Sequence, residues 1–288
     1  MYRVARQGRD NTLNDPRASD QEILLESYGV VVKIQASDAE LFEEAVETAR
    51  KALVGRVKIL ESAEAEHVFG FSSDQTGTLY LFRNGEQLAT DTLRKRFFKF
   101  FNSMIRIAVA EYARNCVFIH AGVVGWKGKA IIIPANSFAG KTTLVTELVK
   151  IGATYYSDEY AVLDENGLVH PFPRDLSVRD AFFNERDVPV TELGGQTGTD
   201  PIPVGAVIIT EFEDNGRWEP VRLTAGQGIL EVIPHTIPRN FNTKFSLKVL
   251  NTAISDAIIL KSPRGEAREL ALNFLSLLDN FTTVAKIT

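Results

Sequence analysis

The sequence predicts an α/β fold with a core from about residue 115 onwards and a small α+β module before it. Two patterns predict the core: the apolar run AIIIP at 130–134 leads through a loop into a helical pattern, and further β-branched runs follow. The length allows one large domain or two modest ones, since 288 residues are shared among domains of roughly 150. We therefore expect a module over 1–114, with a flexible tail over 1–20, and a core domain over 115–288.

Composition excludes several classes of protein. Hydrophobic residues make up 44% of the chain and charged residues 24%, which argues against a disordered chain and a membrane bundle. The net charge of −5 gives no basic field, so we expect neither nucleic acid nor a membrane as a partner. The single cysteine, Cys116, cannot form an internal disulfide, and 1–17 lacks the apolar segment of a signal peptide. We expect a cytoplasmic protein.

The N-terminal module shows strand and helix patterns in turn. The expected elements are a strand over Tyr28–Ile34, a helix capped by Ser37 or Asp38, strands over 68–71, 78–82 and 87–90 with a turn at Asn84-Gly85, and a long buried helix over 92–114.

The core begins with two β-rich runs. The expected elements are strands over 116–126 and 130–134 joined at 127–129, a helix after the loop that Gly152 closes, a strand over 153–164 interrupted by acids, a short run through Val169, a long loop over 174–200, a strand over 204–212 with a hairpin partner at 218–223, helices over 226–233 and 245–254, a strand over 256–260 and a last helix over 266–278.

The motif that carries most chemistry lies between the strand at 130–134 and the helix after it. It matches the phosphate-loop pattern G-x-x-x-x-G-K-[ST] at Gly140, Lys141 and Thr142, and departs from it where Ala135 replaces the first Gly. Backbone N–H groups and the positive end of the helix dipole would meet one anion here. Lys141 adds a charge at the β- and γ-phosphates, and Thr142 offers a hydroxyl to Mg²⁺. The expected nucleotide-binding residues are Ser137, Phe138, Ala139, Gly140, Lys141, Thr142 and Thr143.

Two further features point to the same chemistry. Asp158 and Glu159 follow the lysine at the end of a strand-like stretch, where one carboxylate can bind Mg²⁺ and the other can accept a proton. His120 lies on the hairpin that leads into the loop, and is either a hydrogen-bonded core residue or part of the site. We interpret His235 as structural. Phe138 is expected either to cover the nucleotide or to pack into the core.

The run from His120 (HAGVVGWKGKAIIIPANSFAGKTTLVTELVKIGATYYSDEYAVLD) resembles the HPr kinase/phosphorylase-like P-loop kinases, a group similar in core fold to the ATP-dependent phosphoenolpyruvate carboxykinases. His120, Lys141, Thr142 and Asp158 stand at positions of the family pattern, and Glu159 stands where the family usually has a second aspartate. The resemblance covers about 116–173 well and extends more loosely beyond it.

The resemblance implies phosphoryl transfer from ATP, with Mg²⁺, to a seryl-type hydroxyl of a small molecule, peptide or protein. It implies that Asp158 is the base, that His120 supports the acids and the phosphates, and that Glu159 helps to hold Mg²⁺. It also makes Arg179 the first of three candidates for a phosphate clamp, the others being Arg174 and Arg239.

Other functions and the state of assembly stay open from the sequence. One alternative is a sensor or scaffold that binds ATP without transferring phosphate. A carboxykinase-like enzyme is another, and it would need a second metal site. The sequence does not identify the phosphoryl acceptor, and a homo-oligomer is compatible with it.

Overall fold

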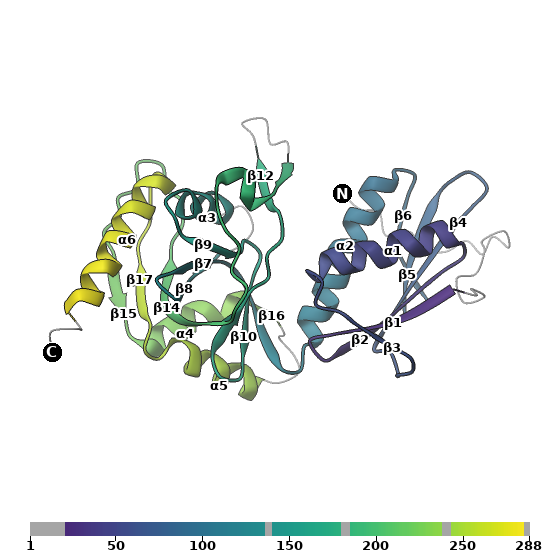
Figure 1. Cartoon of the computed structure of the whole chain (residues 1–288), viewed down its shortest axis with the longest axis horizontal. Coiled ribbons are helices and arrows are strands. Elements are labelled where there is room, and N and C mark those ends of the chain that lie inside the picture. Colours follow the sequence, from purple (N-terminus) through teal and green to yellow (C-terminus); the bar gives the residue numbers. More distant parts are fainter. Residues whose placement is uncertain (1–20, 136–139, 180–184, 238–242, 285–288) are drawn as a thin grey trace. The chain divides into compact units, whose positions relative to one another are not determined.

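The computed structural model of the chain describes residues 21–135, 140–179, 185–237 and 243–284, and of 179, 185 and 280–284 it describes the backbone alone. The chain divides into two compact units, Met1–Asn115 and Cys116–Thr288. Both units are mixed α/β structures, and Figure 1 labels most of their helices and strands.

The N-terminal unit is a sheet covered by two helices. Its described strands follow the order β3-β1-β2-β4-β5-β6, in which β2 and β4 are parallel and the other pairs are antiparallel. The elements are β1 (Gln21–Ser27), β2 (Val30–Ala36), α1 (Ala39–Ala52), β3 (Lys58–Leu60), β4 (His67–Ser73), β5 (Leu79–Arg83), β6 (Glu86–Asp91) and α2 (Arg94–Tyr112).

Alternation along β2 explains how this sheet meets its helices. Val30, Val32 and Ile34 are buried, whereas the residues between them are half-buried, as expected for a strand with one face on a core. The α1 helix begins where Asp38 accepts a hydrogen bond from the Leu41 N–H at 2.9 Å. Residues of both helices share one buried cluster with the sheet.

One expected strand of this unit starts later than predicted. The strand expected over Tyr28–Ile34 begins at Val30, because Tyr28 and Gly29 form the turn after β1 and have φ values of 51° and 80°. Positive φ is incompatible with an extended strand. The run therefore contains the turn and second strand of a hairpin.

The C-terminal unit is built on a mixed sheet. The strand order is β11-β10-β7-β8-β14-β17-β15, and both β9 and β16 pair with β7. The strands β8, β14 and β17 are parallel, so their carboxyl ends meet at one edge. The strands are β7 (Cys116–Trp126), β8 (Lys129–Pro134), β9 (Thr154–Ser157), β10 (Tyr160–Asp164), β11 (Leu168–His170), β14 (Ile202–Ile209), β15 (Val221–Leu223), β16 (Thr236–Ile237) and β17 (Ile258–Lys261).

Helices cover both faces of this sheet, as Figure 1 shows. On β8, Ile131 and Ile133 pack with α3 (Lys141–Lys150) and α6 (Ala267–Val284), whereas Ile132 faces the cluster of α4 (Ala225–Val232) and α5 (Thr243–Ile254). A strand buried on both faces reads as a continuous apolar run, which explains the sequence AIIIP.

Three expectations for this unit need correction. The stretch 174–200 is not a plain loop, because it contains the paired strands β12 (Leu176–Arg179) and β13 (Glu185–Val188) and the 3₁₀ helix η2 (Val190–Leu193). The strand expected over 204–212 ends at Ile209. The segment after it contributes β15, which pairs with β17 and not with β14. Long-range pairing of this kind has no local sequence signal.

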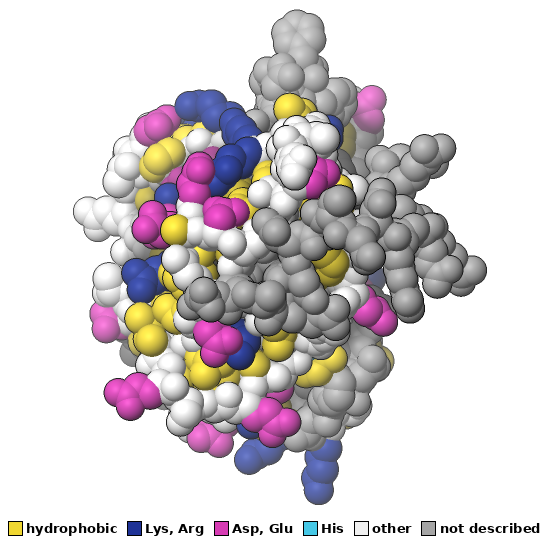
Figure 2. Space-filling view, turned by 90° about the vertical axis from the view of Figure 1, so that its right-hand side faces the viewer, with side chains coloured by type: hydrophobic (Ala, Val, Ile, Leu, Met, Phe, Trp, Pro, Cys, Tyr) yellow, Lys and Arg dark blue, Asp and Glu magenta, His cyan; other side chains and the backbone are white. Residues whose placement is uncertain are grey.

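The surface carries a mixture of side chains. Among the described residues of the face drawn in Figure 2, acidic and basic groups are interspersed with hydrophobic ones. In the described part of the chain, helices long and apolar enough to cross a membrane are absent.

Candidate active site

The site is built where β8 passes into α3. Gly140 precedes the helix with φ 75° and ψ 20°, a left-handed conformation that glycine adopts without strain. Lys141 is the first residue of the helix, so the first N–H groups of α3 lack intrahelical acceptors. The expected contacts of Ser137, Phe138 and Ala139 lie outside the described residues.

Lys141 is buried, with 8% of its surface exposed. Gly122 of β7 makes room for it, since a Cβ at Gly122 would lie 3.1 Å from the Lys141 Cγ and 2.5 Å from a methyl group of Val145. Burial lowers the pKa of Lys141 to about 8, although Asp158 and Glu159 act to raise it. A buried ammonium group with a lowered pKa is poised to gain from an anion.

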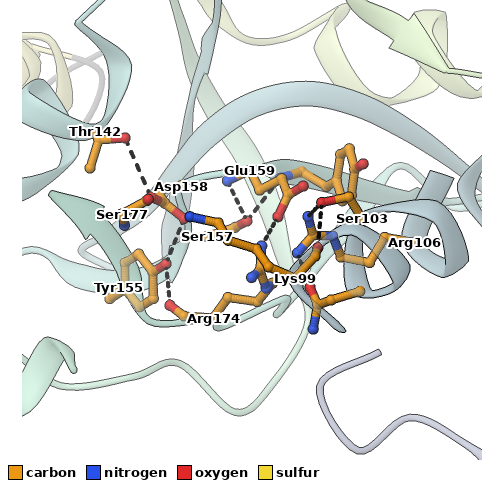
Figure 3. Close-up of polar contacts among 12 residues, drawn as sticks. Lys99, Ser103, Arg106, Thr142, Tyr155, Ser157, Asp158, Glu159, Arg174 and Ser177 are labelled. Atoms are coloured by element: carbon orange, nitrogen blue, oxygen red, sulfur yellow. Dashed lines mark hydrogen bonds and ion pairs between the residues drawn. The ribbon is translucent and has the colours of Figure 1, made fainter. Parts of the chain in front are cut away.

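Asp158 lies next to this helix in the link between β9 and β10 (Figure 3). Its carboxylate accepts from the Thr142 Oγ1 at 3.4 Å, from the Tyr155 hydroxyl at 3.2 Å and from the Ser177 N–H at 3.3 Å. Burial raises the pKa of Asp158, and the neighbouring Glu159 adds to this, whereas the Ser177 hydrogen bond opposes it. The carboxylate is thus held in place without being strongly stabilised as an anion.

Glu159 is held differently from Asp158. Its carboxylate is ion-paired with Arg174, and its N–H donates to the Ser157 Oγ at 3.1 Å. The Tyr155 hydroxyl also donates to the Arg174 carbonyl at 2.7 Å, so the loop that carries this arginine is tied to the same cluster (Figure 3). Of the two acids, Asp158 is therefore the one beside Thr142.

His120 lies on β7 between the acids and the loop. Its carbonyl accepts from the Ala135 N–H at 3.4 Å, and Ala121 donates to the Glu159 carbonyl at 3.1 Å. Burial and then the Lys141 charge lower the pKa of His120 to about 4, while Glu159 opposes them. The imidazole is consequently neutral at pH 7 in the ligand-free protein.

Several residues of the site lack a sequence signal. Arg264, after β17, is 3% exposed and donates to the Gly140 carbonyl at 3.1 Å. His235, which we interpreted as structural, precedes β16, and its pKa is lowered by burial and then by Lys141. Tyr155 contacts Asp158 directly. Sheet pairing and packing bring these residues to the loop, and local spacing does not encode either.

The other predicted residues are placed as follows. Thr142 is half-buried and Thr143 is exposed on the first turn of α3. Arg174 reaches the acids, as described above. The side chain of Arg179 and all of Arg239 lie outside the described residues, so their expected contacts do as well.

The described side chains do not form a complete set of ligands for a metal ion. Groups of three or more His, Cys, Asp and Glu residues that could hold a metal are absent from them. Thr142 and Asp158 nevertheless place two oxygen atoms 3.4 Å apart. Because Mg²⁺ keeps few protein ligands and binds largely through substrate phosphates and water, the Thr142 hydroxyl can serve as its ligand with Asp158 beside it.

Fold and site together define a mixed α/β protein whose buried lysine opens a helix beside a buried aspartate. No family model matches the chain, and no curated protein matches it. Among solved structures it is similar to the HPr(Ser) kinase/phosphatase from Coxiella burnetii, with 16% identity, a TM-score of 0.34, and coverage of 59% of this chain and 98% of that chain.

Proposed function

We propose that the chain is a kinase that transfers the γ-phosphoryl group of ATP, with Mg²⁺, to a hydroxyl group. One observation carries the proposal: the buried Lys141 is the first residue of α3, and the hydroxyl of the next residue, Thr142, donates to the buried Asp158 at 3.4 Å. A buried cation that forms no direct ion pair among the described residues can bind phosphate, and a carboxylate of raised pKa can accept a proton, and phosphoryl transfer uses both groups.

The phosphates would bind at the first turn of α3. The free N–H groups at a helix start and the helix dipole favour a polyanion, and Lys141 adds its charge. Among the described residues Lys141 forms no ion pair within 4.0 Å, which leaves its ammonium group for the phosphates. The unfavourable burial of this charge would be offset when a nucleotide binds.

Asp158 would act as the general base. The acceptor hydroxyl gives its proton to Asp158, its oxygen forms a bond to the γ-phosphorus, and the bond from that phosphorus to the β,γ-bridging oxygen breaks, so ADP leaves. A raised pKa makes a carboxylate a better proton acceptor near neutral pH. The contacts from Tyr155 and Ser177 fix its orientation.

The metal ion is assigned to Thr142 and the phosphates. When bound, Mg²⁺ neutralises charge on the β- and γ-phosphates. From the sequence Glu159 was expected to hold this ion, but its carboxylate is ion-paired with Arg174. We therefore give Glu159 the role of holding Arg174 at the site, with His120 supporting the acids and the phosphates.

The test begins with binding. Isothermal titration of wild type with Mg²⁺ and a non-hydrolysable ATP analogue should show one site, and Lys141→Met should lose most of that affinity. Lys150→Met is the matched control, because Lys150 is exposed at the far end of the same helix and its ion pair is with Glu147. Equal affinity in Lys141→Met and wild type would remove the phosphate-loop assignment.

Transfer is tested separately. Cell extract incubated with γ-labelled ATP should show a protein-dependent labelled product, which fractionation assigns to small molecules, peptides or proteins. The Asp158→Asn protein should still bind nucleotide, but the labelled product should form about 10²–10⁴-fold more slowly, as expected for loss of a general base. Binding without any transfer by wild type would replace the kinase by an ATP-binding sensor.

A further inference from the structure

Three parallel strands end at the same edge of the C-terminal sheet. The first, β8, leads to Gly140 and α3; its neighbour β14 ends at Ile209, and β17 ends at Lys261. Ligands of open α/β sheets bind outside the carboxyl ends of such strands. The segments after β14 and β17 therefore lie beside the place where we expect the phosphates.

These two segments are joined to each other and to the phosphate loop. The Arg264 N–H donates to the Glu211 carbonyl at 3.0 Å, and the Glu213 N–H donates to the Arg264 carbonyl at 2.9 Å. The side chain of Arg264 then reaches the Gly140 carbonyl at 3.1 Å. A Cβ at Gly140 would lie 2.3 Å from the Arg264 Nη2, so the contact is tight.

Phe212 stands out at this edge because its ring is held but not covered. The Arg264 guanidinium lies over the ring, with Cζ 5.6 Å from the ring centroid, and the residue is 54% exposed. The Arg264 residue is buried, and within the described part of the chain its Nε has no hydrogen-bond partner. A cation over one face orients the ring, and the residue nevertheless stays largely exposed.

An aromatic face beside a phosphate-binding loop matches the shape of a nucleotide. The phosphates of a nucleotide at α3 project its sugar and base away from the helix start, and Phe212 is linked to that start through the single side chain of Arg264. Bases stack on aromatic side chains because every base has a π face. A lone exposed phenylalanine elsewhere on the surface would carry no such meaning.

We propose that Phe212, supported by Arg264, is the stacking platform for the base of the nucleotide whose phosphates bind at Lys141. This inference rests on the proposed function, which supplies the phosphates, and adds a base site to it. The face of a purine base would stack on the ring of Phe212.

The experiment separates the base from the phosphates. Affinities for Mg·ATP analogue and for Mg·tripolyphosphate, which has no base, are measured by titration for wild type, Phe212→Ala, Phe212→Leu and Phe212→Trp. Phe212→Ala and Phe212→Leu should weaken analogue binding about 5- to 150-fold, the range that 1–3 kcal/mol of stacking gives. The affinity for tripolyphosphate should not change in these variants. Phe212→Trp should keep the wild-type affinity for the analogue, and its tryptophan fluorescence should be quenched when the analogue binds.

Leu272→Ala is the matched control, since Leu272 is 50% exposed on α6 and outside this edge. Unchanged analogue affinity in Phe212→Ala would overturn the platform and leave the kinase proposal standing. Equal losses of affinity for both ligands would also overturn it, because they would show that Phe212 supports phosphate binding and does not contact the base. If wild type binds neither ligand, the proposed function fails and the base site fails with it.

Discussion

Asp74 in the N-terminal unit and Asp158 in the C-terminal unit have pKa values that shift in opposite directions. Asp74 accepts from the Thr76 hydroxyl at 2.6 Å and the Tyr80 hydroxyl at 2.8 Å, and these bonds lower its pKa to about 2. Asp158 also accepts hydrogen bonds, but burial outweighs them and raises its pKa. Exposure to water lets hydrogen bonds decide the first case, and desolvation decides the second.

This difference extends to the surroundings of each residue. In the N-terminal unit the pKa of Asp91 is lowered, first by the hydrogen bond from Arg96. In the C-terminal unit Lys141 is buried with a pKa lowered to about 8. Asp74 and Asp91 are thus stabilised as ions, whereas the ionised forms of Lys141 and Asp158 are destabilised by burial in one site, an arrangement typical of functional sites.

The largest expected effect tests the structural character of the N-terminal unit. Phe101→Ala should lower its free energy of unfolding by about 3–5 kcal/mol, because the ring is fully buried between Phe69 and Phe71. Chemical denaturation followed by circular dichroism measures this. Ile59→Ala, at a residue 59% exposed on β3, is the control and should cost far less. Similar losses in both variants would contradict the assigned core.

An intermediate effect tests the two aspartates directly. A raised folded-state pKa means that ionised Asp158 costs stability above that pKa, so Asp158→Asn should raise the unfolding temperature at pH 7. The lowered folded-state pKa means that ionised Asp74 stabilises the fold above about pH 4, which is close to the ordinary pKa of Asp. This stabilisation is lost as the pH falls toward 2. Asp74→Asn should therefore lower the unfolding temperature at pH 7. Calorimetry that finds shifts of the same sign would break the comparison.

The smallest expected effect is a pH dependence of nucleotide binding. Lys141 loses its proton near pH 8 in the free protein, and bound phosphates would raise its pKa again, so binding takes up a proton above pH 8. The affinity for the Mg·ATP analogue should fall by up to about tenfold per pH unit there. Titrations from pH 7 to 10 measure this, and Lys141→Met should lack the slope. A flat wild-type profile would show that Lys141 stays protonated.

Local patterns predicted most helices and strands, because capping, turns and apolar periodicity act over a few residues. Asp38 as an N-cap and the hairpin at 127–129 are confirmed. One error came where partners lie far apart along the chain, in the pairing of β15 with β17. The hairpin of β12 and β13 was also missed, although its strands are close in the chain. Tyr28 as the start of a strand failed for a local reason, since its turn conformation depends on the hairpin that β1 completes.

The sequence alone determined the strand before Gly140 and the helix after it, and placed Lys141 at the helix start, since neighbouring residues specify such elements. Only the tertiary structure brought Arg264 to Gly140 across 124 residues and set Tyr155 and Thr142 on Asp158. It also decided the pKa directions, because burial depends on the whole sheet and its helices. Desolvation is a property of the folded surroundings that residue types alone do not carry.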